Sequence, residues 1–285
     1  MTTELTIGAI NPGYGGLPIG VAAALGGATL AWHAHPCQPF DYAGRMIMRY
    51  HHPRASAYIS VDAPPPMVDV LTINGFSDWW HSYRPLLWSG HKPPMIVVEV
   101  HTDDAKARPI CEYLNERGYR TAPVGTKASY VGAPHDRYRE YAVAVRKDCE
   151  APTVNEAYLD AEPYSGVLWP TPIMNNASLL ETACQWALDD LDGHPDKART
   201  QALEHWAKVT GEPYPYPLYT APTPEQTGSL SLGFLEWMMG LPIGYVSTPN
   251  LPIARAERRH LLQTGTVPLQ AAHAVAVGLK QMGDQ

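Results

Sequence analysis

The sequence has few cysteines, and no two of them stand at the short spacing that metal sites use. The 285 residues contain four, Cys37, Cys111, Cys149 and Cys184. The absence of a CxxC pair argues against a structural zinc site, and the wide separation argues against a disulfide framework. We therefore expect free thiols and no bound metal.

Long apolar runs and a basic leader are also missing. No stretch of 18 apolar residues occurs, so neither a transmembrane helix nor a membrane partner is predicted. The first residues, Met-Thr-Thr-Glu-Leu-Thr, contain no basic segment ahead of an apolar one, so no signal peptide is predicted. A cytoplasmic location is the expectation that follows.

Basic residues are in deficit. The chain has 28 acidic and 21 basic residues, which gives a formal net charge of −7. Proteins that bind duplex DNA strongly neutralise its phosphates with lysine and arginine, so a strong general DNA-binding surface is not predicted, although a local basic patch stays open. With 45% hydrophobic residues, the chain can bury a sizeable core in one large domain or in a large and a small one.

The N-terminal segment predicts a strand, a glycine turn and a helix. Leu5 to Ile10 is a short apolar stretch, Asn11-Pro-Gly-Tyr-Gly-Gly16 follows it, and Leu17 to Ala28 is rich in alanine. Such a turn lets a ligand approach the backbone and places helix N-terminal amides beside it, as in dinucleotide and S-adenosylmethionine sites. The glycines alone are equally compatible with a tight connection that binds nothing.

Apolar stretches further along the chain predict buried strands. They run from Ala28 to Ala34, from Val68 to Thr72 and from Pro93 to His101, and a helix is predicted from Lys106 to Gly118. Glu99 stands near the end of a buried strand. A carboxylate needs a partner in such a place, so Glu99 is a functional candidate.

The stretch from Leu230 to Val246 carries the clearest family signature. On physical grounds it predicts a short core helix, with apolar residues at helical spacing that end at Gly240 and Pro242. Its sequence, Leu-Ser-Leu-Gly-Phe-Leu-Glu-Trp-Met-Met-Gly-Leu-Pro-Ile-Gly-Tyr, closely resembles the segment that follows the target-recognition region in bacterial and phage DNA (cytosine-5) methyltransferases.

This resemblance continues in motif order along nearly the whole chain. It implies an α/β protein with the Rossmann-like S-adenosylmethionine-dependent methyltransferase fold and a small inserted target-recognition-like domain. The implied domains are a methyltransferase-like catalytic domain at 1–149, the small domain at 150–226, and a C-terminal part at 227–285 that returns to the first domain.

The small domain is expected to contain two helices, from Ser178 to about Leu191 and from Lys197 to Val209. Acidic residues are frequent in it, and negative charge repels DNA phosphates. The small domain therefore suits a protein contact better than DNA recognition.

Most of the residues that the resemblance assigns to cofactor binding match the family, and one differs from it. The glycine turn matches the family loop that holds S-adenosylmethionine, and Gly265 and Val267 match the motif that completes the cofactor pocket. The residues of the turn are Gly13, Tyr14, Gly15, Gly16 and Leu17. However, His35 stands where the family has an acidic residue that binds the cofactor ribose, and a neutral imidazole accepts only one hydrogen bond. S-adenosylmethionine is thus an implied cofactor that His35 argues against.

The catalytic thiol does not stand where the family places it. Pro36-Cys37-Gln38 resembles the family's catalytic loop, whose thiolate attacks carbon 6 of cytosine, but it follows the second strand. The strand that should precede this loop matches Val68-Asp-Val-Leu-Thr72, so Ser77 or Asp78 holds the nucleophile's position. The serine has no evident activating base, and a carboxylate is a poor carbon nucleophile. The alternative is that Cys37 reaches the same pocket from a neighbouring strand end.

The base pocket of the family is better retained. Glu99 matches the glutamate that hydrogen-bonds N3 and the exocyclic amine of cytosine, and Arg137 and Arg139 match two arginines that contact the base carbonyl. The segment between Ser77 and Glu99 is shorter than in the family. Its tryptophans, Trp79, Trp80 and Trp88, suit either base stacking or ordinary packing.

Two functional hypotheses follow, and whether the protein is an enzyme stays open. The first is a pseudoenzyme that no longer methylates and instead binds DNA, a cytosine nucleotide or a protein partner. The second is an enzyme that modifies cytosine in DNA, by methyl transfer through Cys37 or by altered base chemistry through Asp78. A structural subunit that needs an active paralogue is a third interpretation, and a homo-oligomer is also open.

Overall fold

The computed structural model describes residues 4–35, 41–58, 65–75, 92–100, 107–161, 163–169, 197–217 and 230–284. They belong to two units. The first unit comprises Met1–Thr126, Tyr138–Asp160 and Pro268–Gln285, and the second comprises Lys127–Arg137 and Ala161–Val267. The division into 1–149, 150–226 and 227–285 stays a prediction.

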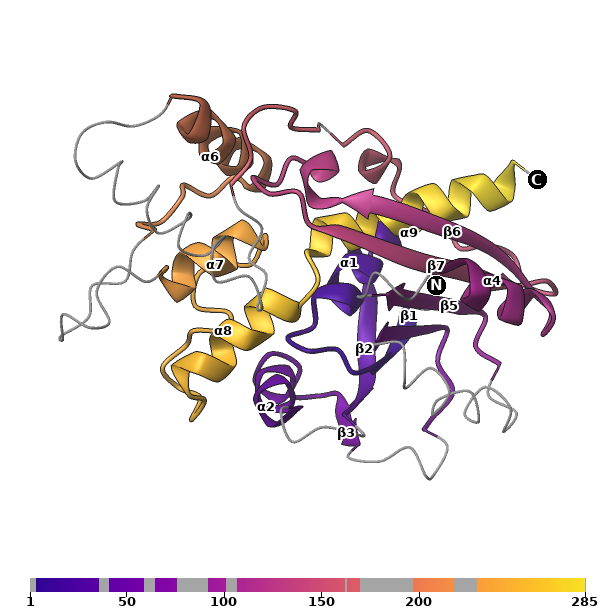
Figure 1. The fold of residues 1–285 in the computed structure, drawn as a ribbon. Helices are drawn as coiled ribbons and strands as arrows, with labels where there is room; N and C mark the ends of the chain where they lie inside the picture. Colours follow the sequence, from indigo (N-terminus) through magenta and orange to yellow (C-terminus); the bar gives the residue numbers. More distant parts are fainter. Residues whose placement is uncertain are drawn as a thin grey trace. The chain divides into compact units, whose positions relative to one another are not determined.

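A seven-stranded sheet forms the centre of the first unit, in the order β3-β2-β1-β4-β5-β7-β6 (Figure 1). Its strands are β1 (Leu5–Ile10), β2 (Ala28–Ala34), β3 (Ser56–Tyr58), β4 (Val70–Gly75), β5 (Met95–Val100), β6 (Tyr119–Lys127) and β7 (Tyr138–Arg146). Strands β1 to β5 pair in parallel, and β7 runs antiparallel to β5. The strand order reverses at β1, between β2 and β4, and open α/β sheets bind their ligands at such a switch point.

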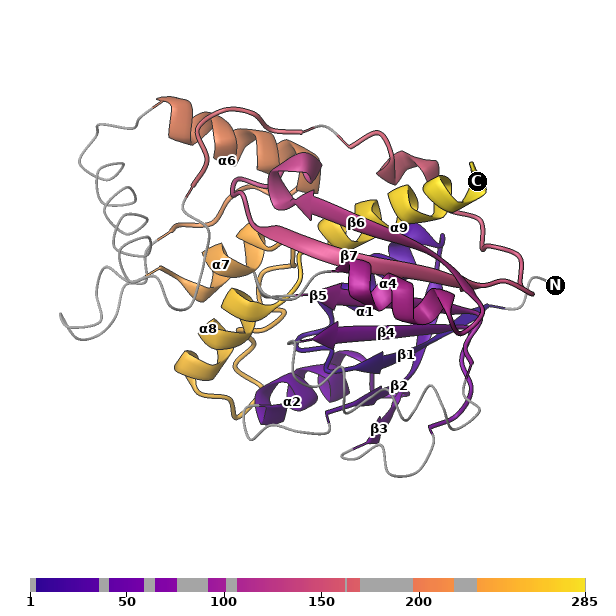
Figure 2. The ribbon, with the colours of Figure 1, turned by 45° about the vertical axis from the view of Figure 1, so that its right-hand side comes forward.

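Helices cover both faces of this sheet. Helices α1 (Gly16–Ala24) and α9 (Pro268–Gly283) lie on one face, and α4 (Ala107–Asn115) lies on the other (Figure 2). Successive strand residues alternate between the faces, so Val97 packs with α1 and α9, whereas Ile96 packs with α4. Because both faces are buried, β5 is a continuous apolar run apart from Glu99.

Helices α1 and α9 approach each other closely through a glycine. A Cβ atom on Gly20 would lie 2.3 Å from the carbonyl oxygen of Pro268 and 2.7 Å from the Ala271 side chain. On the sheet side of α9, a Cβ atom on Gly278 would lie 2.8 Å from Val143. The last helix therefore fits between α1 and β7 only because these two glycines have no side chain.

The predicted strands of the first unit are confirmed, and the unit has further elements. Strands β1 and β2 have the predicted limits. Helix α1 ends at Ala24, short of the predicted end, because Gly26 and Gly27 follow with φ angles of 72° and 121°. The further elements include helix α2 (Asp41–His51), β3 and β6.

Aromatic side chains form the core of the second unit. Its helices are α6 (Lys197–Thr210), α7 (Leu232–Met238) and α8 (Arg255–Thr264), and a 3-10 turn, η1, spans Ala128–Val131. Trp206 donates its indole N–H to the carbonyl oxygen of Trp237 at 2.7 Å, and Phe234 stacks on Trp237. The helices predicted within Leu230 to Val246 and from Lys197 are thus confirmed. The stretch predicted as a helix from Ser178 lies outside the described residues.

Glu236 fixes the loop that follows α7. Its carboxylate is fully buried and accepts hydrogen bonds from the backbone N–H groups of Gly244, Val246 and Ser247, at 2.8, 2.6 and 2.5 Å. The Ser247 hydroxyl donates a fourth bond at 2.9 Å. The glutamate of the family-like stretch is therefore an anchor for its own loop.

Candidate functional site

The glycine turn follows β1 and leads directly into α1. Asn11, Gly13 and Gly15 adopt positive φ angles of 50°, 57° and 98°, a conformation that glycine tolerates best. The N–H of Gly15 donates to the Pro12 carbonyl oxygen at 2.7 Å, and α1 begins at Gly16. The strand, turn and helix predicted from the sequence are present, so helix N-terminal amides lie at the carboxyl end of β1.

The side chains of the turn point into the protein. Tyr14 and Leu17 are fully buried, and Leu17 belongs to the core that α1 and α9 form on the sheet. Helix α2 packs directly on the turn, because a Cβ atom on Gly44 would lie 2.8 Å from the Gly13 carbonyl oxygen. What the turn can offer a ligand is therefore its backbone.

Two buried histidines lie at the carboxyl end of β2, beside this turn. His33 and His35 are 0% and 4% exposed, and the Nε2 atom of His35 lies 3.0 Å from the Nδ1 atom of His33. Among the described residues, the other ring nitrogens, His33 Nε2 and His35 Nδ1, have no hydrogen-bond partner. The buried Oδ1 atom of Asn11 likewise has no hydrogen-bond partner among the described residues. The backbone N–H of Asn11 donates to the Ala34 carbonyl oxygen at 2.9 Å.

Both imidazoles are neutral at pH 7. Burial lowers the pKa of His33 to about 4, and the charges of His52, Arg49 and Arg45 act in the same direction. Burial lowers the pKa of His35 to about 3, with contributions from His33, Arg45 and Arg49. Because both arginines belong to α2, this helix brings positive charge close to the end of β2.

S-adenosylmethionine does not fit the side chains at this edge of the sheet. Its ribose presents two neighbouring hydroxyl groups, whereas His35 offers one acceptor at the position that the resemblance assigns to the ribose. The backbone of the turn matches the implied cofactor, and the side chains around it oppose it.

A buried ion pair lies at the same edge of the sheet, at the end of β5. Glu99 is fully buried, and the Nε atom of Arg139 donates to its Oε1 atom at 3.1 Å. Arg139 comes from the start of β7, and Glu99 pairs in register with Asn74 of β4 and Tyr141 of β7. The predicted base-pocket residues Glu99 and Arg139 are therefore brought together from positions 40 residues apart.

Arg137 belongs to the second unit, where its guanidinium group is buried. Its Nη2 atom donates to the carbonyl oxygen of Gln263 at 2.5 Å, and its Nη1 atom points to the carbonyl oxygen of Leu262 at 3.5 Å. These carbonyls belong to the last turn of α8, where cations are favoured. The observed contacts of Arg137 hold this helix end, and its predicted contact with a base stays a prediction.

Gly265 and Val267 also belong to the second unit. Gly265 ends α8 and donates its N–H to the Leu261 carbonyl oxygen at 2.8 Å, and Val267 is fully buried. The glycine turn and His35 belong to the first unit. Their joint role in one cofactor pocket stays a prediction.

The candidate nucleophiles Cys37, Ser77 and Asp78 lie outside the described residues, as do Trp79, Trp80 and Trp88. In sequence, Cys37 follows β2, whereas Ser77 and Asp78 follow β4. Strand β4 lies between β1 and β5 at the centre of the sheet. The choice between Cys37 and the later residues stays a prediction.

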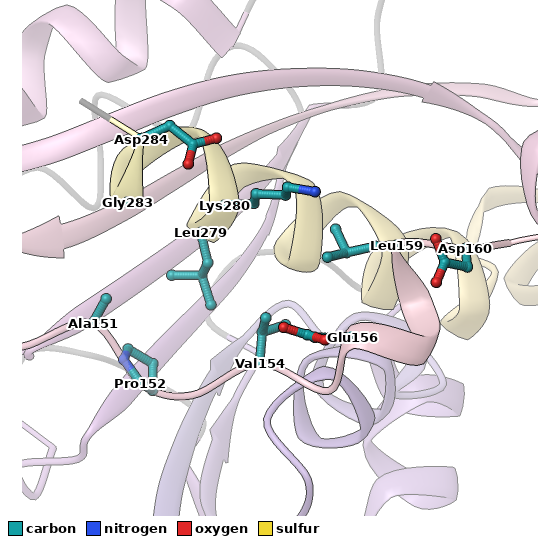
Figure 3. A pocket seen from close by; sticks show the side chains of 10 residues that line it. All are labelled: Ala151, Pro152, Val154, Glu156, Leu159, Asp160, Leu279, Lys280, Gly283 and Asp284. Atoms are coloured by element: carbon teal, nitrogen blue, oxygen red, sulfur yellow. The ribbon is translucent and has the colours of Figure 1, made fainter.

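Outside these candidate sites, the described residues contain a pocket but no metal site and no membrane-spanning helix. No group of three or more His, Cys, Asp and Glu side chains among them is arranged to hold a metal ion. None of the helices that they form has the length and apolar character needed to cross a bilayer. A pocket of about 430 Å³ lies between the C-terminal end of α9 and residues 151–160, and no predicted site residue lines it (Figure 3).

Of the residues at the end of β2 and on α2, His35 was part of the predicted site, whereas His33, Arg45 and Arg49 were not. His33 and His35 are two residues apart on a strand and so share one face, and Arg45 and Arg49 are four apart on a helix. Both spacings are visible in the sequence. The signal that was lacking is the position of α2 against the glycine turn.

Comparison with solved structures identifies the fold. The chain resembles the Dnmt2 methyltransferase of S. pombe with a TM-score of 0.62 and 11% identity, over 98% of this chain and 99% of that one. It resembles an E. coli prophage protein described as a DNA modification methyltransferase with a TM-score of 0.58 and 13% identity, over 99% and 100%. It resembles the Entamoeba histolytica methyltransferase EhMeth with a TM-score of 0.56 and 12% identity, over 95% of this chain and 97% of that one. The fold is that of these methyltransferases.

The predicted Rossmann-like methyltransferase fold class is thereby confirmed over nearly the full length of the chain. No protein-family model matches the chain, and no curated protein matches its sequence. At 11% to 13% identity the likeness establishes the fold, and function has to be argued from the site.

Proposed function

We propose that the protein binds a cytosine base, within a nucleotide or a nucleic acid, and does not methylate it. The observation that carries this proposal is the buried ion pair of Glu99 and Arg139 at the end of β5. The pair lies at the carboxyl edge of the parallel strands, where open α/β sheets bind their ligands.

The chemistry of the pair complements cytosine. Cytosine carries an amine donor on carbon 4 beside the acceptors N3 and O2. The Glu99 carboxylate can accept from the amine. The guanidinium group of Arg139 donates from Nε to Glu99 and from Nη1 to the Tyr138 carbonyl oxygen, and its remaining N–H groups can donate to the carbonyl oxygen of the base. Uracil carries a carbonyl oxygen on carbon 4 in place of the amine, so an acceptor would face the carboxylate oxygen, which is itself an acceptor. Buried polar sites strongly reject such mismatches.

Two features support binding without methyl transfer. The position of the family's nucleophile is held by Ser77 or Asp78, and neither side chain supplies a thiolate. The side chains at the ends of β1 and β2 do not suit S-adenosylmethionine, as His35 replaces a carboxylate there. Loss of an essential nucleophile costs many orders of magnitude in rate, so binding is what these residues favour.

The binding test compares 2′-deoxycytidine with 2′-deoxyuridine by titration calorimetry. We expect deoxycytidine to bind at least about tenfold more tightly, since a buried hydrogen bond to a charged group is worth about 1.5–3 kcal/mol. Glu99→Gln should remove this preference, and Glu112→Gln, on the exposed side of α4, is the matched control. Equal affinities for the two nucleosides would contradict the base pocket.

Folding of the variants needs its own check, because removing one partner of a buried ion pair costs about 3–5 kcal/mol. The double variant Glu99→Gln/Arg139→Gln removes both charges and leaves neither unpaired. If only the double variant folds, the loss of base preference is measured on it.

The methylation test incubates the protein with DNA and S-adenosylmethionine and measures 5-methylcytosine by mass spectrometry. We expect none above the level of a heat-inactivated sample. Formation of 5-methylcytosine that Cys37→Ser abolishes would overturn the proposal and establish the thiol at residue 37 as the nucleophile.

A further inference from the structure

The edge formed by the ends of β1 and β2 has unused hydrogen-bonding capacity. His35 is 4% exposed, His33 is fully buried, and one ring nitrogen of each has no partner among the described residues. The buried Oδ1 atom of Asn11, at the start of the glycine turn, also has no hydrogen-bond partner among the described residues. Buried polar atoms are normally paired, so these atoms point to a ligand that completes them.

Helix α2 supplies positive charge to this edge. Gly44 packs on the Gly13 carbonyl oxygen, which places the first half of α2 against the turn. Arg45 follows Gly44 directly, and Arg49 lies one helical turn later on the same side. Burial is the main cause of the lowered pKa values of His33 and His35, and the charges of both arginines act in the same direction.

The two imidazoles can present a donor to a ligand without carrying a charge. A neutral imidazole has one N–H, so in the contact between His35 Nε2 and His33 Nδ1 one ring donates and the other accepts. When His33 Nδ1 donates, His35 carries its own proton on Nδ1, and the unpartnered Nδ1 becomes a donor. An anion near His35 favours this tautomer, because the N–H then points at negative charge.

We infer that this edge binds the phosphate groups of a small phosphorylated nucleotide, held by Arg45 and Arg49, by the Nδ1–H of His35 and by the amides at the start of α1. A carboxylate at the end of β2 suits a ribose hydroxyl, whereas arginine nearby suits a phosphate on the nucleotide. Amides at a helix N-terminus favour the same anion. This inference does not depend on the cytosine pocket at Glu99.

The experiment measures binding of ADP, adenosine, pyrophosphate and S-adenosylhomocysteine to the full chain by titration calorimetry. We expect ADP to bind at least about tenfold more tightly than adenosine, because each charge-assisted phosphate contact contributes about that factor, and pyrophosphate shows how much of the affinity the phosphates supply alone. S-adenosylhomocysteine, which has no phosphate, should bind more weakly than ADP. Equal affinity of ADP and adenosine, tighter binding of S-adenosylhomocysteine, or no ADP binding at millimolar concentration would each overturn the inference.

Variants assign the effect to residues. Arg49→Gln, at an exposed position of α2, should weaken ADP about tenfold and leave adenosine unchanged, whereas the same change of charge at exposed Arg108 of α4 should leave both unchanged. His35→Asp should weaken ADP and strengthen adenosine, because it restores a carboxylate at the end of β2. If His35→Asp does not fold, Arg49→Gln and Arg108→Gln still decide the matter. An equal loss of ADP affinity in these two arginine variants would overturn the site.

The outcomes are separable from those of the proposed function. The probes for the base pocket are nucleosides without phosphate, and the probe here is a phosphorylated purine nucleotide. Glu99→Gln should leave ADP binding unchanged, and Arg49→Gln should leave the deoxycytidine preference unchanged. Failure of one proposal can therefore be recognised while the other stands.

Discussion

Glu99 and Glu236 are both fully buried carboxylates, and they differ in what surrounds them. Glu236 accepts from three backbone N–H groups and one hydroxyl of a single loop, so its hydrogen-bonding capacity serves the fold. Glu99 pairs with a guanidinium group that comes from another strand, at the ligand-binding edge of the sheet. A family-like signature around a buried glutamate thus does not by itself indicate chemistry.

Substitution of Glu236 should destabilise the second unit strongly. In Glu236→Gln an amide N–H₂ group replaces one oxygen and faces backbone N–H groups, so buried donors lose their acceptor. We expect a loss of about 3 kcal/mol in the free energy of unfolding, measured by urea denaturation. Glu204→Gln, on the exposed side of α6, should change it by less than about 0.5 kcal/mol. A Glu236→Gln midpoint like that of Glu204→Gln would contradict the anchoring role.

The histidine pair should make stability depend on pH. An unfolded histidine has a pKa of about 6.5, whereas burial holds His33 at about 4 and His35 at about 3. Between these values the unfolded chain binds more protons than the folded one. The free energy of unfolding should therefore be complete above about pH 7 and fall below pH 6.5, by about 1.4 kcal/mol per pH unit for each histidine.

Urea denaturation between pH 7.5 and pH 4.5 tests this dependence. Comparison with His35→Asn isolates the histidine contribution from that of other titrating groups, and the slope with pH should be smaller in the variant. An identical slope in the two proteins would show that His35 is not kept neutral by burial.

At the level of elements, local sequence patterns predicted individual strands and helices but not which of them pack together. Strand β2 and helix α7 follow from contiguous apolar runs and a helix stop, which need no knowledge of the rest of the chain. Helix α2 was hidden because the residues just before it resemble a catalytic loop, although Ala43 and Ile47 already stand four apart on its buried side. The pairing of Glu99 with Arg139 needs the antiparallel register of β5 and β7, which no local pattern contains.

The contact of α1 with α9 gives a test at this level. Gly20→Ala places a Cβ atom 2.3 Å from the Pro268 carbonyl oxygen, so the two helices must separate. We expect a loss of about 1–3 kcal/mol in the free energy of unfolding, as for other overpacked sites. Gly283→Ala, at the end of α9 with no atom within 4 Å of the added Cβ, should be neutral or slightly stabilising by helix propensity. Equal effects of the two substitutions, measured by thermal and urea denaturation, would argue against the close helix contact.

For the molecule as a whole, the charge balance sets what it can bind. The net charge of −7 disfavours duplex DNA, although α2 carries Arg45 and Arg49 locally. We expect fluorescence anisotropy with a duplex oligonucleotide at 150 mM salt to show no binding tighter than about 10⁻⁶ M, the ordinary range of non-specific association. Submicromolar, strongly salt-dependent binding to duplex DNA would show that the protein has a basic surface that outweighs its net negative charge.

The late position of α9 in the sequence determines when one face of the central sheet can be covered during synthesis. The helix that completes one face of the central sheet spans Pro268–Gly283, so a ribosome makes it after the entire second unit. Until then, apolar residues of β1, β4 and β5 on that face, such as Ile7, Val70 and Val97, lack the cover that α9 provides. The first unit therefore matures late, and its nascent form should depend on chaperones to avoid aggregation.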